Sequence, residues 1–191
     1  SFATPLESRS NFMFKVSGVA ARIRERYYQS DNYTSFDNPD ITTLTLLSPA
    51  ATIERDTRDY PLYATSGGKE KFVVRYNFVH EQFRAGTRTY NLESRSSNSH
   101  NSLLVRAFSE RYFKLGQHFS LGYIAEITAS GKNSMSNYIS TLLQMPAFRP
   151  VAHNNTLMME GYRANSFIGI GISPVILFTK TLFLHTNISY F

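Results

Sequence analysis

Residues 71–83 read KFVVRYNFVHEQF, and hydrophobic and polar residues alternate along this stretch. Successive side chains of a β-strand point to opposite faces, so every second residue shares a face. One face carries Phe72, Val74, Tyr76 and Phe78. The other face carries Lys71, Arg75, Asn77, Val79 and Glu81. The stretch therefore predicts a strand with one apolar face and one mainly polar face.

The same two-residue period recurs along the chain. It is clear at residues 12–21, 119–128, 167–173 and 182–190, and weaker at 103–113. A further segment, 42–53, contains Pro49, which disfavours an uninterrupted central strand. We therefore expect about seven strands, most of about 10 to 14 residues, whereas strands of globular proteins average about 5 to 6. Such lengths suit a membrane barrel, in which roughly 9 to 11 residues cross the bilayer at a tilt.

The segments between the expected strands are rich in turn-forming residues. Residues 31–40 are rich in Asn, Asp, Ser and Pro, and residues 84–101 in Arg, Ser and Asn. The longest stretch without alternation covers about residues 130–165 and contains Pro146 and Pro150. Long loops on the external side are typical of outer-membrane barrels. We expect residues 1–191 to form a single β-barrel segment that includes this long loop.

The polar faces help to distinguish a membrane barrel from a soluble β-sandwich, which also alternates but turns its apolar face into a core. Here the polar faces carry Lys15, Arg75, Glu81, Glu126, His185 and Asn187. This set suits a wide lumen that is wet or plugged. Aromatic residues also stand near several strand ends, as in the girdles of outer-membrane barrels. We expect an all-β fold, an antiparallel transmembrane β-barrel; the alternative is a soluble β-barrel or sandwich that binds an apolar ligand.

The composition excludes several classes of protein. Aromatic residues make up 14% and charged residues 18% of the 191 residues, which is unlike a disordered chain. The absence of cysteine excludes a disulfide scaffold, a zinc–thiolate site and cysteine catalysis. The sequence has no nucleophile elbow, P-loop or dinucleotide motif, and its five histidines lack metal-ligand spacing. We expect no catalytic residue, no cofactor and no metal site in this chain.

The net charge of +6 comes from basic residues scattered along the chain. A nucleic-acid binder would cluster them on one face or tail, so we expect no nucleic-acid partner. The tightest set is Arg22, Arg24 and Arg26, whose spacing of two places them on one face of a strand. This set fits either a solvated strand end or a contact with phosphate or lipopolysaccharide.

Two local patterns carry a resemblance to a known family. One is ERDTRDYP at residues 54–61, followed by two glycines at 67–68; the other is MEGYRAN at 159–165. They resemble the BamA-type outer-membrane barrel superfamily. Its members carry an Asp-Thr-Arg-Asp segment before a central strand and, further on, an Arg-Gly-aromatic motif at the tip of a loop that folds into the lumen. In this chain the order of the second motif is Gly161-Tyr162-Arg163.

A finer resemblance is to the C-terminal barrel of Bacteroidetes patatin-like phospholipases. It rests on PAFRP at residues 146–150, YRANSF at 162–167 and the Gly-rich strand from residue 168 to 174. The resemblance covers about residues 52–191. It implies that the chain is part of an anchoring barrel of about 16 strands. A hydrolase domain with the catalytic Ser and Asp would then lie upstream in the full protein.

The last expected strand suggests that the barrel continues. Phe191 falls on the face of His185, Asn187 and Ser189, whereas Tyr190 belongs to the apolar face. Single-chain bacterial barrels also have even numbers of strands. We expect the chain to be incomplete at both ends.

The resemblance implies a barrel in the bacterial outer membrane that anchors or translocates a passenger, in a patatin-like phospholipase or a surface antigen. The expected partners are outer-membrane lipid, lipopolysaccharide and other outer-membrane subunits. The alternative within the membrane class is a stand-alone structural or pore barrel of about eight strands.

Arg163 is the candidate contact of an inward-folded loop. It precedes a strand whose polar face carries Gly169, Gly171 and Ser173, small residues that leave room in the lumen. A guanidinium inside a barrel favours a fork-like pair with a carboxylate. We expect Glu126 as the partner and Glu81 as the second candidate. The alternative is an arginine on a solvated loop with no partner.

Overall fold

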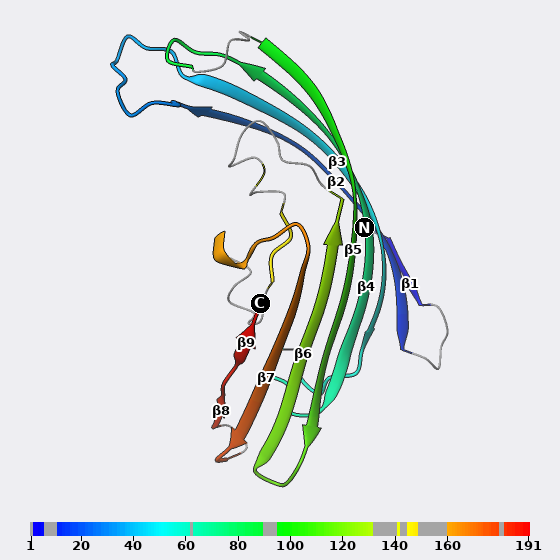
Figure 1. Cartoon of the computed structure of the whole chain (residues 1–191). Coiled ribbons are helices and arrows are strands. Elements are labelled where there is room, and N and C mark those ends of the chain that lie inside the picture. Colours follow the sequence, from blue (N-terminus) through cyan, green and yellow to red (C-terminus); the bar gives the residue numbers. More distant parts are fainter. Residues whose placement is uncertain are drawn as a thin grey trace.

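The computed structural model describes residues 2–5, 11–61, 63–89, 95–131, 141, 145–148, 160–179 and 182–191. Nine strands form one antiparallel sheet (Figure 1). They are β1 (Phe2–Pro5), β2 (Phe12–Tyr27), β3 (Asp40–Asp56), β4 (Gly67–Arg84), β5 (Arg95–Lys114), β6 (Phe119–Ser130), β7 (Phe167–Leu177), β8 (Phe183–His185) and β9 (Ile188–Tyr190). A 3-10 turn, η2 (Glu160–Tyr162), precedes β7. The all-β antiparallel fold expected from the alternation is confirmed.

The strands follow one another in the sheet in sequence order, from β1 to β8. Both β8 and β9 pair with β7. His185 lies opposite Val175 and Ile188 opposite Ile172, so the two short strands share one register. They are two parts of a single line along the edge of the sheet.

The strands β2 to β5 are 16 to 20 residues long, which exceeds the expected length. The largest difference is in β5, which includes residues 95–102, a segment whose composition predicts a loop. These residues pair with the upper half of β4, from Asn77 opposite Ser102 to Arg84 opposite Arg95. The pairing satisfies their backbone N–H and C=O groups, so a segment rich in Ser and Asn is extended without apolar alternation.

Pro49 lies within β3 rather than ending it. The register of β3 with β4 runs to Leu47 opposite Phe78 and resumes at Ala50 opposite Arg75. Proline has no N–H to donate, which accounts for this gap. Side chains bridge the strands there: the Ser48 hydroxyl donates to Oδ1 of Asn77 at 2.6 Å. The Asn77 amide in turn donates to Ser102 on β5 at 3.2 Å.

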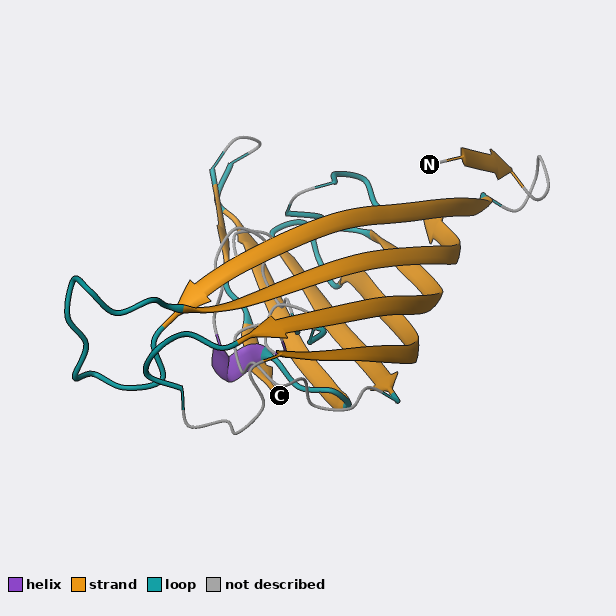
Figure 2. Cartoon of the chain, turned by 90° about the horizontal axis from the view of Figure 1, so that it is seen from above, coloured by secondary structure: helices purple, strands orange, loops and turns teal. Residues whose placement is uncertain are grey.

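The two ends of the sheet differ in their connections. Strands β2, β4 and β6 end, and β3, β5 and β7 begin, at the upper end in Figure 1. Strands β3, β5 and β7 end, and β4, β6 and β8 begin, at the lower end. Figure 2, the view from above, shows the strands as a curved wall with loops beyond their ends. The longest connection joins β6 to β7 at the upper end, whereas the β3–β4 connection at the lower end is as long as the β4–β5 connection at the upper end.

The sheet has an inner face and an outer face. The inner face carries Ser48, Glu81, Glu126 and Ser173, which are buried, and the outer face carries Phe72, Leu103, Ile127 and Ile168, which are exposed. Apolar contacts on the inner face are small clusters: Leu44 with Val79, and Ala64 with Tyr112 and Val175. Among the described residues, eleven buried side chains are hydrophobic and eleven are polar or charged. The interior is therefore unlike the apolar core of a sandwich.

The sheet is open in the part of the chain that the structure describes. The pairing order ends with β1 on one side and with β8 and β9 on the other. No pair among the described strands joins these two edges. The expected barrel is therefore seen only as a curved antiparallel sheet.

Candidate functional site

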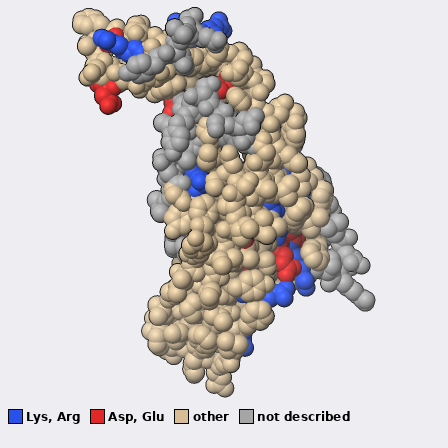
Figure 3. All heavy atoms as spheres, viewed as in Figure 1, with Lys and Arg blue, Asp and Glu red and all other residues tan. Residues whose placement is uncertain are grey.

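The outer face is apolar and exposed over most of the sheet. Ile168 is 66% and Ile188 is 67% exposed, although both are large aliphatic residues. In Figure 3 the lower left part of the view is tan, whereas charged residues gather to the right of it. Other exposed large residues of this face are Val16, Leu47, Ile53, Val74, Tyr76, Phe78, Phe113, Tyr123, Ile170, Ile172, Ile176 and Leu184. Contiguous apolar patches of this extent mark a surface that meets another apolar phase or partner.

The apolar residues form an oblique band across the sheet. On β4 the band runs upward from Phe72 to Phe78, and on β7 it runs downward from Ile168 to Ile176. Phe72 lies opposite Ala107, Ala107 opposite Ile127, and Ile127 opposite Ile168. The row from Phe72 to Ile168 thus marks the lower end of the band on β4 but the upper end of the band on β7. The band is tilted relative to these rows.

Charged residues of the outer face border this band below. Glu70 accepts from Arg111 at 2.6 Å and lies 3.8 Å from a guanidinium nitrogen of Arg55. Arg55 also lies over the ring of Phe12, 5.4 Å from its centroid. The lower border is therefore made of paired charges.

The lower end of the inner face is closed by the β3–β4 turn, which contains the Asp-Thr-Arg-Asp segment at residues 56–59. Arg58, whose side chain is 11% exposed, makes a fork-like pair with Asp56 at 2.9 and 2.8 Å. Its other nitrogen reaches Glu110 on β5 at 3.2 Å. Glu110 also accepts from the Tyr112 hydroxyl at 2.8 Å. Arg58 therefore ties the turn to the inner wall, a role that sequence reasoning did not assign to it.

The remaining residues of the segment shape the turn itself. The Thr57 N–H donates to the carbonyl of Gly68 at 2.8 Å. The carboxylate of Asp59 accepts from the backbone N–H groups of Tyr60, Thr65 and Ser66. Burial raises the pKa of Asp59, but the hydrogen bonds from Thr65 and the backbone outweigh it, so its pKa lies below the usual value. An ionised Asp59 is thus the state that holds the turn.

Gly67 is the position where this turn requires glycine. Its φ is +86°, and a Cβ there would come within 2.1 Å of the carbonyl oxygen of Thr57. The turn then folds Ala64, 1% exposed, against Tyr112 and Val175 on the inner face. The second half of the turn therefore covers the base of the sheet's interior.

A second set of inner-face charges lies between β3 and its neighbours. Glu54 accepts from Lys15 at 2.8 Å and from Lys69 at 2.9 Å. Lys69 also lies 3.5 Å from Asp56. This set joins β2, β3 and β4 by side chains that point into the interior.

The predicted site residues Glu126 and Glu81 are both on the inner face and almost wholly buried. Arg106 on β5 makes a fork-like pair with Glu126, with both nitrogen–oxygen distances at 2.8 Å. Thr128 donates to the same carboxylate at 3.2 Å. Glu81 lies 3.0 Å from Nε2 of His100. Glu126 therefore makes a fork-like pair with Arg106.

Arg163 itself lies in the segment beside η2. Its Nη1 donates to the carbonyl of Met145 at 3.1 Å. Ala147 and Arg163 form an antiparallel bridge, and the N–H of Phe148 donates to Tyr162 at 2.9 Å. Coupling between Arg163 and the carboxylates of the sheet stays a prediction. The candidates Arg163 and Glu126 could be identified from the sequence, whereas Arg106 required the register of β5 with β6.

The described part of the long connection covers the upper inner face. Phe148 is 1% exposed, and a Cβ on Gly169 would lie 2.4 Å from its ring. Phe191 stacks on Phe148 at 5.8 Å and packs edge-on against Phe167 at 5.0 Å. Figure 1 shows this segment within the hollow of the curved sheet. The ring of Phe148 thus fills the space that the small residues of β7 leave.

A hollow of about 480 Å³ separates this segment from the inner wall. Basic side chains dominate the charged part of its lining: Lys15, Lys71, Arg75, Arg106 and Arg163, with Glu54. Within the described residues no group of three or more His, Cys, Asp or Glu could hold a metal ion. No helix of the described part is both long and apolar enough to cross a bilayer.

No protein-family model matches this chain, and no significant match was found among curated proteins or solved structures.

Proposed function

We propose that this chain forms part of the wall of a bacterial outer-membrane β-barrel, with its outer face in contact with lipid. The oblique apolar band carries the proposal. A membrane is a flat slab, and the strands of a barrel cross it at roughly 35–45°. The apolar stretch must then move along successive strands relative to their paired rows, as it does between β4 and β7.

The inner face supports the same proposal. A soluble sandwich would turn the apolar faces of its strands inward, whereas here Phe72, Ile127 and Ile168 point out and Glu81 and Glu126 point in. An inward polar face with an outward apolar face is the arrangement of transmembrane barrels. The longest connection, between β6 and β7, agrees with the long loops that such barrels carry on their external side.

The two edges of the sheet must be paired in such a membrane. Unpaired backbone groups in hydrocarbon cost several kcal/mol each, so only closed barrels are stable there. We propose that further strands complete a larger barrel between the edge at β1 and the edge at β8 and β9. The role of this chain is then to anchor or translocate a passenger, as its resemblance to patatin-like phospholipase barrels implies, and it carries no catalysis itself.

Refolding of the full-length protein tests the proposal. We expect strand-rich circular dichroism in detergent micelles or phosphatidylcholine vesicles, and resistance of the vesicle-bound barrel to extraction by carbonate. In buffer without detergent we expect aggregation through the outer face. A monomeric, folded protein in buffer alone would contradict the proposal.

A further inference from the structure

Five arginines gather on the outer face at the upper end of the sheet. We infer that these residues, Arg22, Arg24, Arg26, Arg84 and Arg95, form a surface that binds the phosphate groups of lipopolysaccharide. We call this set the arginine surface. The inference rests on the proposed membrane function, and it adds a lipid partner and an orientation.

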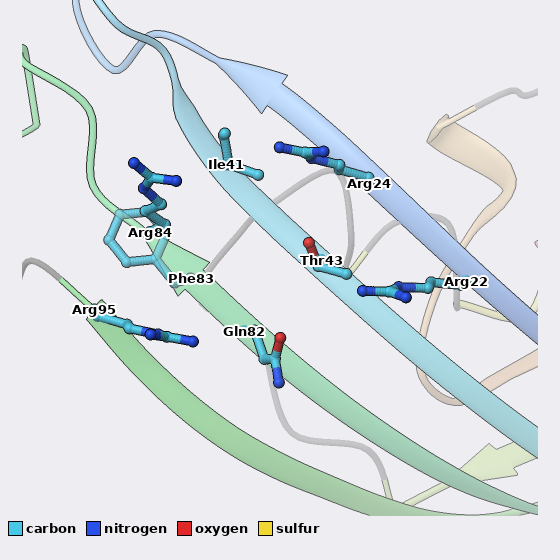
Figure 4. Close-up of a pocket in the computed structure, with 8 residues that line it drawn as sticks. All are labelled: Arg22, Arg24, Ile41, Thr43, Gln82, Phe83, Arg84 and Arg95. Atoms are coloured by element: carbon cyan, nitrogen blue, oxygen red, sulfur yellow. The ribbon is translucent and has the colours of Figure 1, made fainter.

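The register brings the five residues together from three strands. Arg26 lies opposite Ile41, Ile41 opposite Arg84, and Arg84 opposite Arg95, so one paired row carries three of them. Arg24 and Arg22 follow on the same face of β2. Figure 4 shows four of the five, from β2, β4 and β5, on either side of Thr43 and Gln82. Residues that are distant in sequence thus make one cationic surface.

These arginines have no carboxylate partners among the described residues, since no ion pair of theirs is found there. The acidic residues of the same strand ends, Glu25, Asp40 and Glu81, belong to the inner face by the alternation of their strands. The side chains between the arginines, such as Thr43 and Gln82, are neutral. At the lower border of the band, by contrast, Glu70 pairs with both Arg55 and Arg111. An uncompensated cationic surface favours an anionic partner.

The shape of the surface suits a ligand with several phosphates. One hollow of about 450 Å³ is lined by four of the arginines, with Arg22 and Arg24 on one side and Arg84 and Arg95 on the other. A second hollow of about 390 Å³ adjoins it and is lined by Arg26 and Arg84. Both share Ile41 and Arg84. Guanidinium groups bind phosphate oxygens in a fork-like manner, so each hollow offers more than one such donor.

The position next to the apolar band identifies the lipid. Arg22 is two residues beyond Ala20, and Arg84 is six residues beyond Phe78, or about 7 and 20 Å along a strand. The cations therefore begin at the edge of the band and continue beyond it. Lipopolysaccharide carries phosphates next to its acyl chains and further phosphates in its inner core. Phosphatidylglycerol offers a single phosphate at one depth.

Lipid binding by variants of the full-length protein tests the inference. The test variant is R22Q/R84Q, and the control is R55Q/R111Q, which removes the same charge from the lower border. Native mass spectrometry from detergent would measure retention of purified lipopolysaccharide, dephosphorylated lipopolysaccharide and phosphatidylglycerol. We expect the test variant to bind lipopolysaccharide at least about tenfold more weakly than the wild type, and the control to bind as the wild type does. Dephosphorylation should weaken wild-type binding to a similar extent.

The inference would be overturned by equal binding of the test variant and the wild type, by equal loss in the control, or by equal binding of phosphatidylglycerol. Displacement by inorganic phosphate at the concentration of the lipid would show a free-anion site instead, and would also overturn it. Insertion into phosphatidylcholine vesicles is measured in parallel for every variant. Failure of the wild type to insert refutes the membrane function, whereas insertion without selective lipopolysaccharide binding refutes only this inference.

Discussion

A single guanidinium balances the most buried carboxylate of the inner face. The side chain of Glu126 has no exposed surface, and Arg106 meets both of its oxygens. Removing one member of such a buried pair costs about 3 to 5 kcal/mol, because the other charge stays buried without its partner. We predict this loss in the free energy of unfolding for Arg106→Ala, measured by urea titration in detergent.

A double-mutant cycle with Glu126→Gln distinguishes the observed Arg106–Glu126 pair from the Arg163–Glu126 pair that the sequence predicts. Coupling should be strong between residues 106 and 126 and weak between residues 163 and 126. The reverse order would show that Arg163 is the true partner of Glu126. Arg106 could not be predicted from the sequence because it contacts Glu126 diagonally between β5 and β6. The residue directly opposite Glu126 is Phe108.

The packing of Phe148 against β7 requires that residue 169 has no side chain. A methyl group on Gly169 would meet the ring of Phe148, which is buried. We predict that Gly169→Ala destabilises the protein by about 1 to 3 kcal/mol, the usual cost of overpacking. Gly18→Ala is the matched control, because Gly18 is also in a strand and a Cβ added there would have no other atom within 4 Å. Equal unfolding midpoints for the two variants would show that Phe148 does not pack there.

At the scale of elements, the upper connections are joined through one carboxylate. Asp37 accepts from the N–H of Thr34 at 2.9 Å, from the Thr87 hydroxyl at 2.9 Å and from Arg88 at 3.1 Å. The hydrogen bonds from the Thr34 backbone and the Thr87 hydroxyl lower the pKa of Asp37 from 3.8 to about 2. The contact between residues 28–39 and 85–89 therefore depends on an ionised group.

The pH dependence of this contact follows from that shift. The pKa of Asp37 is lower in the folded protein than in the unfolded chain. Its contribution to folding stability is therefore fully present above the unfolded pKa of 3.8 and is lost as pH falls through about 2. We predict that the carboxyl resonance of Asp37 titrates near pH 2 in carbon-13 NMR. The Asp37→Asn variant should show weaker amide protection at Thr34 across the whole range. A titration midpoint near 4 would contradict the loop contact.

Alternation predicts the strands wherever one face is apolar, as in residues 71–83 and 119–128. It fails at residues 95–102, because there both faces are polar and the pairing with β4 decides the conformation. Pro49 predicts an interruption, yet β3 continues through it because Ser48, Asn77 and Ser102 bridge the gap by side chains. These contacts join residues that are far apart in the chain, so the local sequence pattern could not predict them.

At the scale of the whole molecule, the two faces have opposite character. The outer face is apolar in a tilted band, with paired charges at its lower border and the arginine surface above it. The inner face carries buried polar and charged side chains among apolar ones, is covered below by the β3–β4 turn and is covered above by Phe148 and its neighbours. The faces could be assigned from the sequence, but the tilt of the band required the register between strands.

Contact between the outer face and lipid is the central claim, and site-directed spin labels measure it directly. The chain has no cysteine, so each introduced cysteine in this segment is unique within it. Phe72→Cys and Ile170→Cys place labels on the outer face, and Arg75→Cys places one at an exposed position of the inner face. In vesicles containing the full-length protein, the two outer labels should be relaxed strongly by oxygen, which concentrates in hydrocarbon, and weakly by a water-soluble nickel chelate. The inner label should show the opposite preference. Outer labels that are relaxed by the nickel chelate as strongly as the inner one would contradict a lipid-facing band.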